Sequence, residues 1–277
     1  MDASRAARPW FHDHELWIEL FVLANFAGLI LDIFLAHSEN QFRRESEYVP
    51  LVFSAVATVM LACVIPLRRK WPIVWRDVGH LVGWGALAIG LAGVILHLDS
   101  RFFYDRTIRS LTYAAPFAAP LAFAGLGLLL LVNRLVEPDT LEWAQWVLLL
   151  GLGGFIGNFV FSLTDHAQNA FFNPLEWIPV ASSALAIGFL LVPFVVRITT
   201  PYLWLCGSVL LVQATVGVAG FALHAAADWR RPGLTLFERV VSGAPLMAPL
   251  LFPNLVLLAS IALWTWAPHL KNSRSAV

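Results

Sequence analysis

Eight long apolar segments constrain the fold of this chain more than any other feature. They cover residues 17–36, 50–66, 78–97, 112–132, 145–164, 178–196, 202–224 and 243–266. A helix of about 20 apolar residues crosses the hydrocarbon core of a bilayer, and each segment approaches that length. Hydrophobic residues make up 59% of the chain and charged residues 13%, whereas a soluble domain is roughly half apolar and a quarter charged. The sequence therefore predicts an all-α integral membrane protein with eight transmembrane helices and the lipid bilayer as its partner.

The charge and cysteine content exclude some classes of partner and site. The 18 Lys and Arg residues balance 18 Asp and Glu residues without forming a basic stripe, so we exclude nucleic acid as a partner. Cys63 and Cys206 both lie inside apolar segments, which argues against a disulfide or a thiolate metal site. No small-residue cleavage site follows the first apolar run, so we expect that run to remain as a helix.

An even number of spans places both termini on one side of the membrane. The most basic connection, Leu67 to Asp77, falls on that same side, and basic loops favour the cytoplasm. Over all loops the count of Lys and Arg is 10 on that side against 8 on the other. We therefore expect both termini to be cytoplasmic, with the bacterial inner membrane as the location.

The sequence also repeats itself. Residues 37–57 align without a gap on residues 166–186, with 8 identities in 21 positions at a shift of 129. AGVILH from Ala92 matches AGFALH from Ala219 at a shift of 127, and APFAAPLAF from Ala115 matches APLMAPLLF from Ala244 at a shift of 129. Helices 1 to 4 are thus predicted to recur as helices 5 to 8.

This duplication predicts the domain organisation. Four spans per unit is an even number, so both units have the same orientation and are related by a pseudo-twofold axis along the membrane normal. The predicted parts are a cytoplasmic segment 1–16, a first repeat 17–133, a linker 134–144, a second repeat 145–266 and a cytoplasmic tail 267–277.

Four repeated histidines each end an odd-numbered predicted helix, on the side taken as extracytoplasmic: His37, His97, His166 and His224. Imidazole is a common ligand of transition metals, and two imidazoles with one carboxylate form a known metal-binding set. The carboxylates in question are Glu47 and Glu176, one in each repeat. The alternative for these two acids is capping of the helix that follows, since each stands three residues before a proline.

Further polar residues lie close enough in sequence to orient the ligands. They are Asn40, Asn169, Asp99, Asp165 and Asp228. The asparagines belong to the repeat, whereas the three aspartates do not, so a centre that used them would be asymmetric. The repeat is compatible with one shared centre or with one centre in each half.

Three functions are compatible with this pattern. The first is a metalloprotein with a His-rich centre for redox chemistry, metal-assisted catalysis or metal handling, alone or as a subunit of a larger membrane assembly. The second is a b-type haem protein in which His37 pairs with His97, and His166 with His224, as axial ligands. The third is a transporter or channel, although Asp32 is the main charge in the predicted mid-membrane region.

In architecture alone, this duplicated four-helix protein is similar to haem A synthase. The motifs of that family are absent from the sequence, so no residue is carried over from it.

Two secondary predictions concern prolines and the remaining histidines. Pro116 with Pro120, and Pro245 with Pro249, fall within predicted helices 4 and 8, so we expect them to kink those helices. The run His12 to His14 precedes the first helix on the opposite side from the repeated histidines. We expect it, with His80, to be solvated at the membrane interface.

Overall fold

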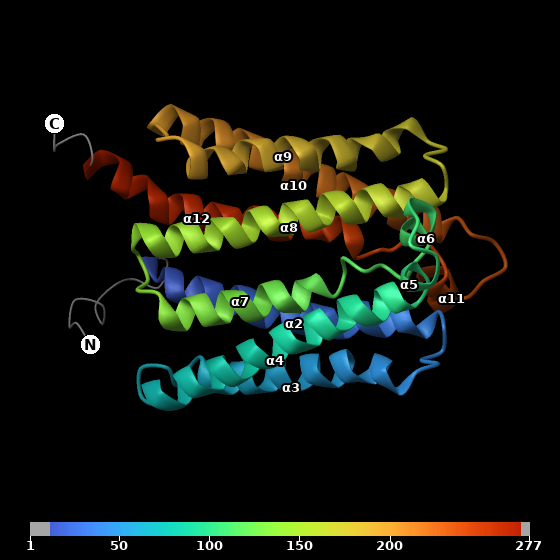
Figure 1. Cartoon of the computed structure of the whole chain (residues 1–277), viewed down its shortest axis with the longest axis horizontal. Coiled ribbons are helices and arrows are strands. Elements are labelled where there is room, and N and C mark those ends of the chain that lie inside the picture. Colours follow the sequence, from blue (N-terminus) through green and yellow to red (C-terminus); the bar gives the residue numbers. More distant parts are fainter. Residues whose placement is uncertain (1–11, 273–277) are drawn as a thin grey trace.

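The computed structural model describes residues 12–272, and every regular element in that part is a helix (Figure 1). The long helices are α2 (His14–Ser38), α3 (Tyr48–Val64), α4 (Pro72–Asp99), α7 (Leu121–Leu135), α8 (Leu141–Gln168), α9 (Trp177–Val195), α10 (Thr200–Trp229) and α12 (Leu251–Asn272). The short ones are η2 (Glu45–Glu47), α5 (Phe102–Asp105), α6 (Ile108–Thr112), η3 (Pro174–Glu176), α11 (Leu236–Val241) and η4 (Ala248–Leu250). The prediction of an all-helical membrane protein is confirmed.

Seven helices in the described part are long and apolar enough to cross a membrane, and α7 is the long helix that falls short. With 15 residues it spans about 22 Å, less than the roughly 30 Å of a bilayer core. The predicted span 112–132 is wrong at its start, because α7 begins only at Leu121. The eighth predicted span, 243–266, likewise starts late: η4 and then α12 begin at residues 248 and 251.

Prolines explain both late starts. Pro116 lies in a series of turns before α7, and Pro120 is the N-cap of that helix. Pro245 precedes η4, and Pro249 lies within it. A proline has no backbone N–H and is tolerated where a helix begins, because the first N–H groups of a helix have no partner there. The predicted kinks in helices 4 and 8 are therefore wrong: these prolines delay the helices instead.

The long helices run nearly parallel or antiparallel to one another as one elongated bundle (Figure 1). The connections that contain α5, α6 and α11 gather at one end, which also holds the C-terminal ends of α2, α4, α8 and α10; we call this end the histidine face. The start of α2 and the end of α12 lie at the opposite end, which we call the terminal face (Figure 1).

Glycines allow α4 and α7 to approach each other closely. A Cβ atom added to Gly127 would lie 2.4 Å from the carbonyl oxygen of Gly83 and 2.9 Å from the backbone nitrogen of Leu87. A Cβ on Gly90 would lie 2.6 Å from the backbone nitrogen of Ala124. Backbone contacts this close need residues without side chains, as is common between helices in membranes.

This contact predicts that Gly127→Val will separate α4 from α7. We expect a loss of about 1–3 kcal/mol of unfolding free energy, the usual cost of overpacking, measured by thermal unfolding in detergent. Gly125→Val is the matched control, because it makes the same change in the same helix where nothing lies within 4 Å of an added Cβ. Equal stability of the two variants would show that the close contact is absent.

A fully buried ion pair joins α2 to α7 near the terminal face. Glu19 and Arg134 both have side-chain exposures of 0%. Arg134 binds both carboxylate oxygens of Glu19, with 3.1 Å between its Nη2 and Oε2, and Asn133 Nδ2 donates to Oε1 at 2.8 Å. The guanidinium carbon of Arg134 also lies 3.6 Å from the centre of the Trp75 ring on α4. These contacts partner both buried charges, which would otherwise be very costly in a membrane.

A pair of asparagines joins α2 to α12. Asn25 Nδ2 donates to Asn254 Oδ1 at 3.1 Å, and Asn254 Nδ2 donates back to Asn25 Oδ1. Asn25 lies about 16 Å along α2 from its first residue, by the helical rise of about 1.5 Å per residue. The pair is therefore a polar contact deep in the bundle, between a helix of the first half of the chain and a helix of the second.

Candidate histidine site

The loops after α2 and α8 have the same backbone conformation. Residues 41 and 42 have φ of 61° and 51°, and residues 170 and 171 have φ of 60° and 51°. None of the four is glycine, and positive φ is uncommon for such residues. A hydrogen bond from Phe42 N to His37 O (3.0 Å) holds the first loop, and one from Phe171 N to His166 O (3.1 Å) holds the second.

The asparagines of the repeat stabilise these loops. Asn40 Oδ1 accepts a hydrogen bond from the backbone N–H of Phe42 at 3.1 Å, and Asn169 Oδ1 accepts the same bond from Phe171 at 3.2 Å. Such side-chain bonds to the backbone two residues on are typical of asparagine in turns. In the first loop, Asn40 Nδ2 also donates to Glu47 Oε1 at 3.2 Å. Asn40 thus links the loop to the glutamate that faces the histidine.

Each loop brings a glutamate to a histidine. His37 Nδ1 lies 3.7 Å from Glu47 Oε2, and His166 Nδ1 lies 3.6 Å from Glu176 Oε2. The two glutamate side chains are only 13% and 12% exposed. Both Oε2 atoms are buried and have no hydrogen-bond partner. Each oxygen lies just beyond hydrogen-bond distance of the imidazole that faces it.

An aromatic ring contacts the histidine of each pair. The ring of Phe42 lies 5.8 Å from that of His37 and stacks on Tyr48 at 4.5 Å. In the second loop, Phe171 lies 6.1 Å from His166 and stacks on Trp177 at 4.0 Å. The imidazoles are therefore held in a partly apolar setting.

The other two histidines bond to the turns that delay α7 and α12. His97 Nδ1 lies 2.9 Å from Pro116 O, and His224 Nδ1 lies 3.0 Å from Pro245 O. A carbonyl oxygen only accepts hydrogen bonds, so Nδ1 must carry the proton and, in a neutral ring, Nε2 keeps its lone pair. Both imidazoles are thus prepared to bind a ligand through Nε2.

The first half brings its two histidines together. The rings of His37 and His97 have centroids 6.4 Å apart and planes at 83°. Asp99, a predicted orienting residue, is the last residue of α4 and is partly exposed.

The second half of the chain differs from the first in the acidic residues near its histidines. Asp165 comes directly before His166, and the position 129 residues earlier is Ala36. Asp228 is 4% exposed, and its Oδ1 accepts a hydrogen bond from Ala244 N at 2.8 Å, so it stabilises the turn before η4.

No three His, Cys, Asp or Glu side chains between residues 12 and 272 are grouped to hold a metal ion. The predicted set of two histidines and one glutamate in each half is therefore not assembled as a three-ligand site. What the structure does bring together are the pairs His37–Glu47 and His166–Glu176, and the ring contact between His37 and His97.

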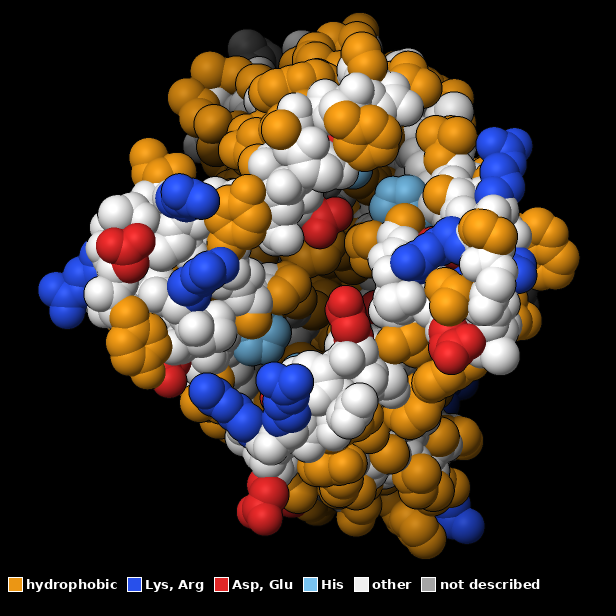
Figure 2. All heavy atoms as spheres, turned by 90° about the vertical axis from the view of Figure 1, so that its right-hand side faces the viewer, with side chains coloured by type: hydrophobic (Ala, Val, Ile, Leu, Met, Phe, Trp, Pro, Cys, Tyr) orange, Lys and Arg blue, Asp and Glu red, His pale blue; other side chains and the backbone are white. Residues whose placement is uncertain are grey.

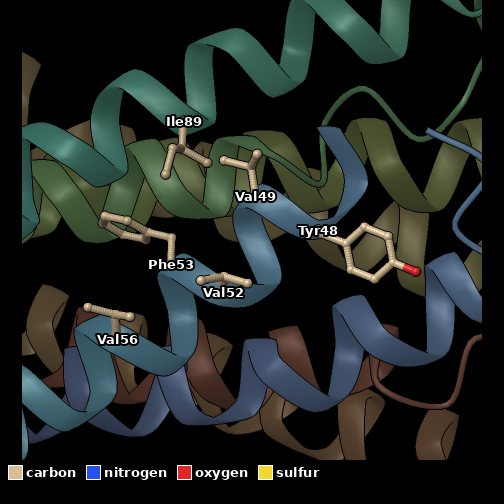
Figure 3. A pocket seen from close by; sticks show the side chains of 6 residues that line it. All are labelled: Tyr48, Val49, Val52, Phe53, Val56 and Ile89. Carbon is tan, nitrogen blue, oxygen red and sulfur yellow. The ribbon is translucent and has the colours of Figure 1, made fainter. Parts of the chain in front are cut away.

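Beside this site, an apolar groove of about 450 Å³ separates α3 from α4 (Figure 3). It is lined by Tyr48, Val49, Val52, Phe53, Val56 and Ile89. The hydroxyl of Tyr48 is the only polar side-chain group among these residues (Figure 3). The groove thus offers almost nothing to orient a polar ligand, and it presents an apolar surface suited to lipid chains.

Sequence reasoning missed a polar group at the terminal face. His14 is only 12% exposed, so its predicted solvation is wrong: its Nδ1 lies 2.6 Å from Asp139 Oδ1 and 3.1 Å from Thr265 Oγ1. His269 Nε2 lies 3.1 Å from the backbone oxygen of Asp139. The partners of His14 come from the α7–α8 connection and from α12, far away in the chain. The sequence therefore offered one clue to this group, the charged residue at position 139.

Viewed from the end, the histidine face is hollowed at its centre, and histidine and acidic side chains border the hollow (Figure 2). The chain matches no protein family, no curated protein and no solved structure. Its class is therefore defined by the fold: an all-helical protein with seven described helices able to span a bilayer.

Proposed function

We propose that this protein is a membrane cytochrome that holds a b-type haem between His37 and His97. The observation that carries the proposal is the 6.4 Å between their ring centroids. Two imidazoles this close together could both bind the iron of one haem.

The hydrogen bonds of these histidines support the same proposal. Histidines that bind a metal usually donate their second ring N–H to a carboxylate or a backbone carbonyl, which orients the ring and strengthens the ligand. Pro116 O serves His97 in this way, and Glu47 Oε2 is placed to serve His37 after a small shift from 3.7 Å. This role would also supply the missing partner of the buried Glu47 oxygen.

Haem also accounts for the small number of protein ligands. The porphyrin supplies four nitrogens to the iron, so the protein needs only two axial residues. No three His, Cys, Asp or Glu side chains within residues 12–272 are grouped to hold a bare metal ion, whereas two histidines are sufficient for haem. The bound group would carry single electrons, and the chain's own residues would orient its ligands and exclude water.

We extend the proposal to the whole architecture. The chain consists of eight membrane helices in two four-helix repeats, with the histidine face outside and the termini in the cytoplasm of a bacterium. Support comes from paired contacts: the two His–Glu distances of 3.7 and 3.6 Å, and the two His–Pro distances of 2.9 and 3.0 Å. In this arrangement His166 and His224 would form a second site of the same kind.

An optical spectrum of the purified protein tests the proposal. We expect a Soret band that sharpens and shifts on reduction with dithionite, together with a pyridine haemochrome spectrum of haem b. Iron should be present at one or two atoms per chain. Protein expressed with added haem precursor and purified without chelator, yet lacking a Soret band, would contradict the proposal.

A metal ion at each His–Glu pair is the second candidate. The N···O distances of 3.6 and 3.7 Å are longer than a hydrogen bond but shorter than the roughly 4.2 Å that two ligands on opposite sides of one ion can span. The partnerless Oε2 atoms favour this candidate. Stoichiometric zinc, copper or manganese without a Soret band would support it over haem.

A further inference from the structure

A basic connection between α3 and α4 lies at the terminal face, away from the histidine site. It contains Arg68, Arg69 and Lys70, and Arg76 follows on the second turn of α4. Arg68 is only 14% exposed and pairs with Asp13, which also accepts a hydrogen bond from Leu16 N at 3.0 Å. Arg68 thus anchors the connection to the start of α2.

The other three cations face outward. Arg69 and Arg76 have side-chain exposures of 53% and 55%. Their acidic neighbours are 3.6 Å and 3.4 Å away, at Asp13 and at the adjacent Asp77. Exposed pairs at such distances contribute little energy, so both guanidinium groups can bind another anion.

Apolar side chains accompany these cations. Trp71 is 51% exposed, Ile73 is 65% exposed and Val74 is 47% exposed. The Lys70 ammonium lies 5.6 Å from the centre of the Trp71 ring. The connection follows the end of one spanning helix and begins the next, so these residues lie at the boundary between lipid and water, where tryptophan is enriched.

The start of α4 adds hydrogen-bond donors. The helix has 28 residues, Pro72 is its first, and its N-cap Trp71 provides no side-chain bond to the first turn. An uncapped helix start attracts a phosphate oxygen. The position of this helix start is fixed from inside the bundle, because Trp75 packs against Arg134, which is paired with Glu19.

From these features we propose that Arg69, Lys70, Trp71 and Arg76 form a headgroup site for an anionic phospholipid of the leaflet at the terminal face. The three cations and the helix start would bind the phosphodiester, while Trp71, Ile73 and Val74 would contact the glycerol and the first part of the acyl chains. The equivalent α9–α10 connection contains a single cation, Arg197, so the site belongs to the first half alone.

Lipid binding by the detergent-solubilised full-length protein tests this proposal. Native mass spectrometry would compare phosphatidylglycerol with phosphatidylcholine of identical chains. Each cation near a membrane surface contributes about a fivefold gain in affinity for anionic lipid, so Arg69→Gln combined with Lys70→Gln should weaken phosphatidylglycerol binding about 25-fold. Phosphatidylcholine binding should stay unchanged in this variant.

A control variant and a competition experiment test the specificity of this effect. Arg43→Gln with Arg44→Gln removes an equally adjacent, exposed arginine pair from the histidine face and should leave phosphatidylglycerol binding intact. Trp71→Ala should weaken lipid binding, and millimolar inorganic phosphate should not compete. The proposal is overturned if the control pair weakens binding as much, if phosphate alone competes fully, or if the test pair has no effect. Arg76→Gln, with an expected fivefold loss, is measured if the double variant does not fold.

Discussion

Replacement of Arg134 by methionine is expected to destabilise the protein by about 3–5 kcal/mol, the usual cost of removing one partner of a buried ion pair. The substitution leaves the Glu19 carboxylate at 0% exposure without its cation. Asn133 alone would remain as a hydrogen-bond donor to it. Unfolding in detergent with increasing denaturant, followed by tryptophan fluorescence, measures the loss.

The second half of the chain suggests the control for this prediction. At a shift of 129, the positions of Glu19 and Arg134 are occupied by Leu148 and Leu263, which are 0% and 7% exposed. The double variant Glu19→Leu with Arg134→Leu introduces the same two leucines into the first half. It should regain most of the unfolding free energy that Arg134→Met loses, because leucines replace both charges. A double variant as unstable as Arg134→Met would mean that packing, rather than the unpaired charge, causes the loss.

Substitution of His97 by alanine is expected to abolish haem binding in the first half. It removes one of two axial ligands, so the Soret absorbance per chain should fall to nearly zero if only the first half is loaded, or by about half if both halves hold haem. His37→Ala should have the same effect. Pyridine haemochrome assays on purified protein give the haem content directly.

His80→Ala is the matched control, because His80 lies in the same helix as His97, near its other end. Its haem content should equal that of the unaltered protein. Full haem content in both His37→Ala and His97→Ala would end the haem proposal, and equal losses in all three variants would indicate a general folding defect.

Hydropathy predicted most of the fold, since seven of the expected spans appear as helices of membrane-crossing length. It failed at residues 112–120, which are apolar enough to resemble a span but contain Pro116 and Pro120; residues 113–120 lie in turns and bends. Hydropathy measures transfer to lipid and does not register missing backbone donors. The ion pair between Glu19 and Arg134 was also missed, because partners 115 residues apart leave no local pattern.

The candidate site was predictable in part. Self-similarity of the sequence predicted which histidines belong together, since four matching positions stood out against unmatched ones such as His80. It did not predict that His97 bonds to Pro116 or that its ring approaches that of His37. The first contact uses a carbonyl in the turns before the late start of α7, and both contacts join residues far apart in the chain, which leave no local pattern.

The asparagine pair between α2 and α12 bears on how such a chain assembles. Helices insert into the membrane first and associate afterwards, and lipid provides no hydrophobic force to choose among their faces. An amide left unpaired in hydrocarbon is costly, so Asn25 and Asn254 favour the one docking register in which both amides bond to each other. Because docking of α2 and α12 in another register would leave both amides unpaired, this contact would select the correct helix arrangement while the protein assembles in the membrane.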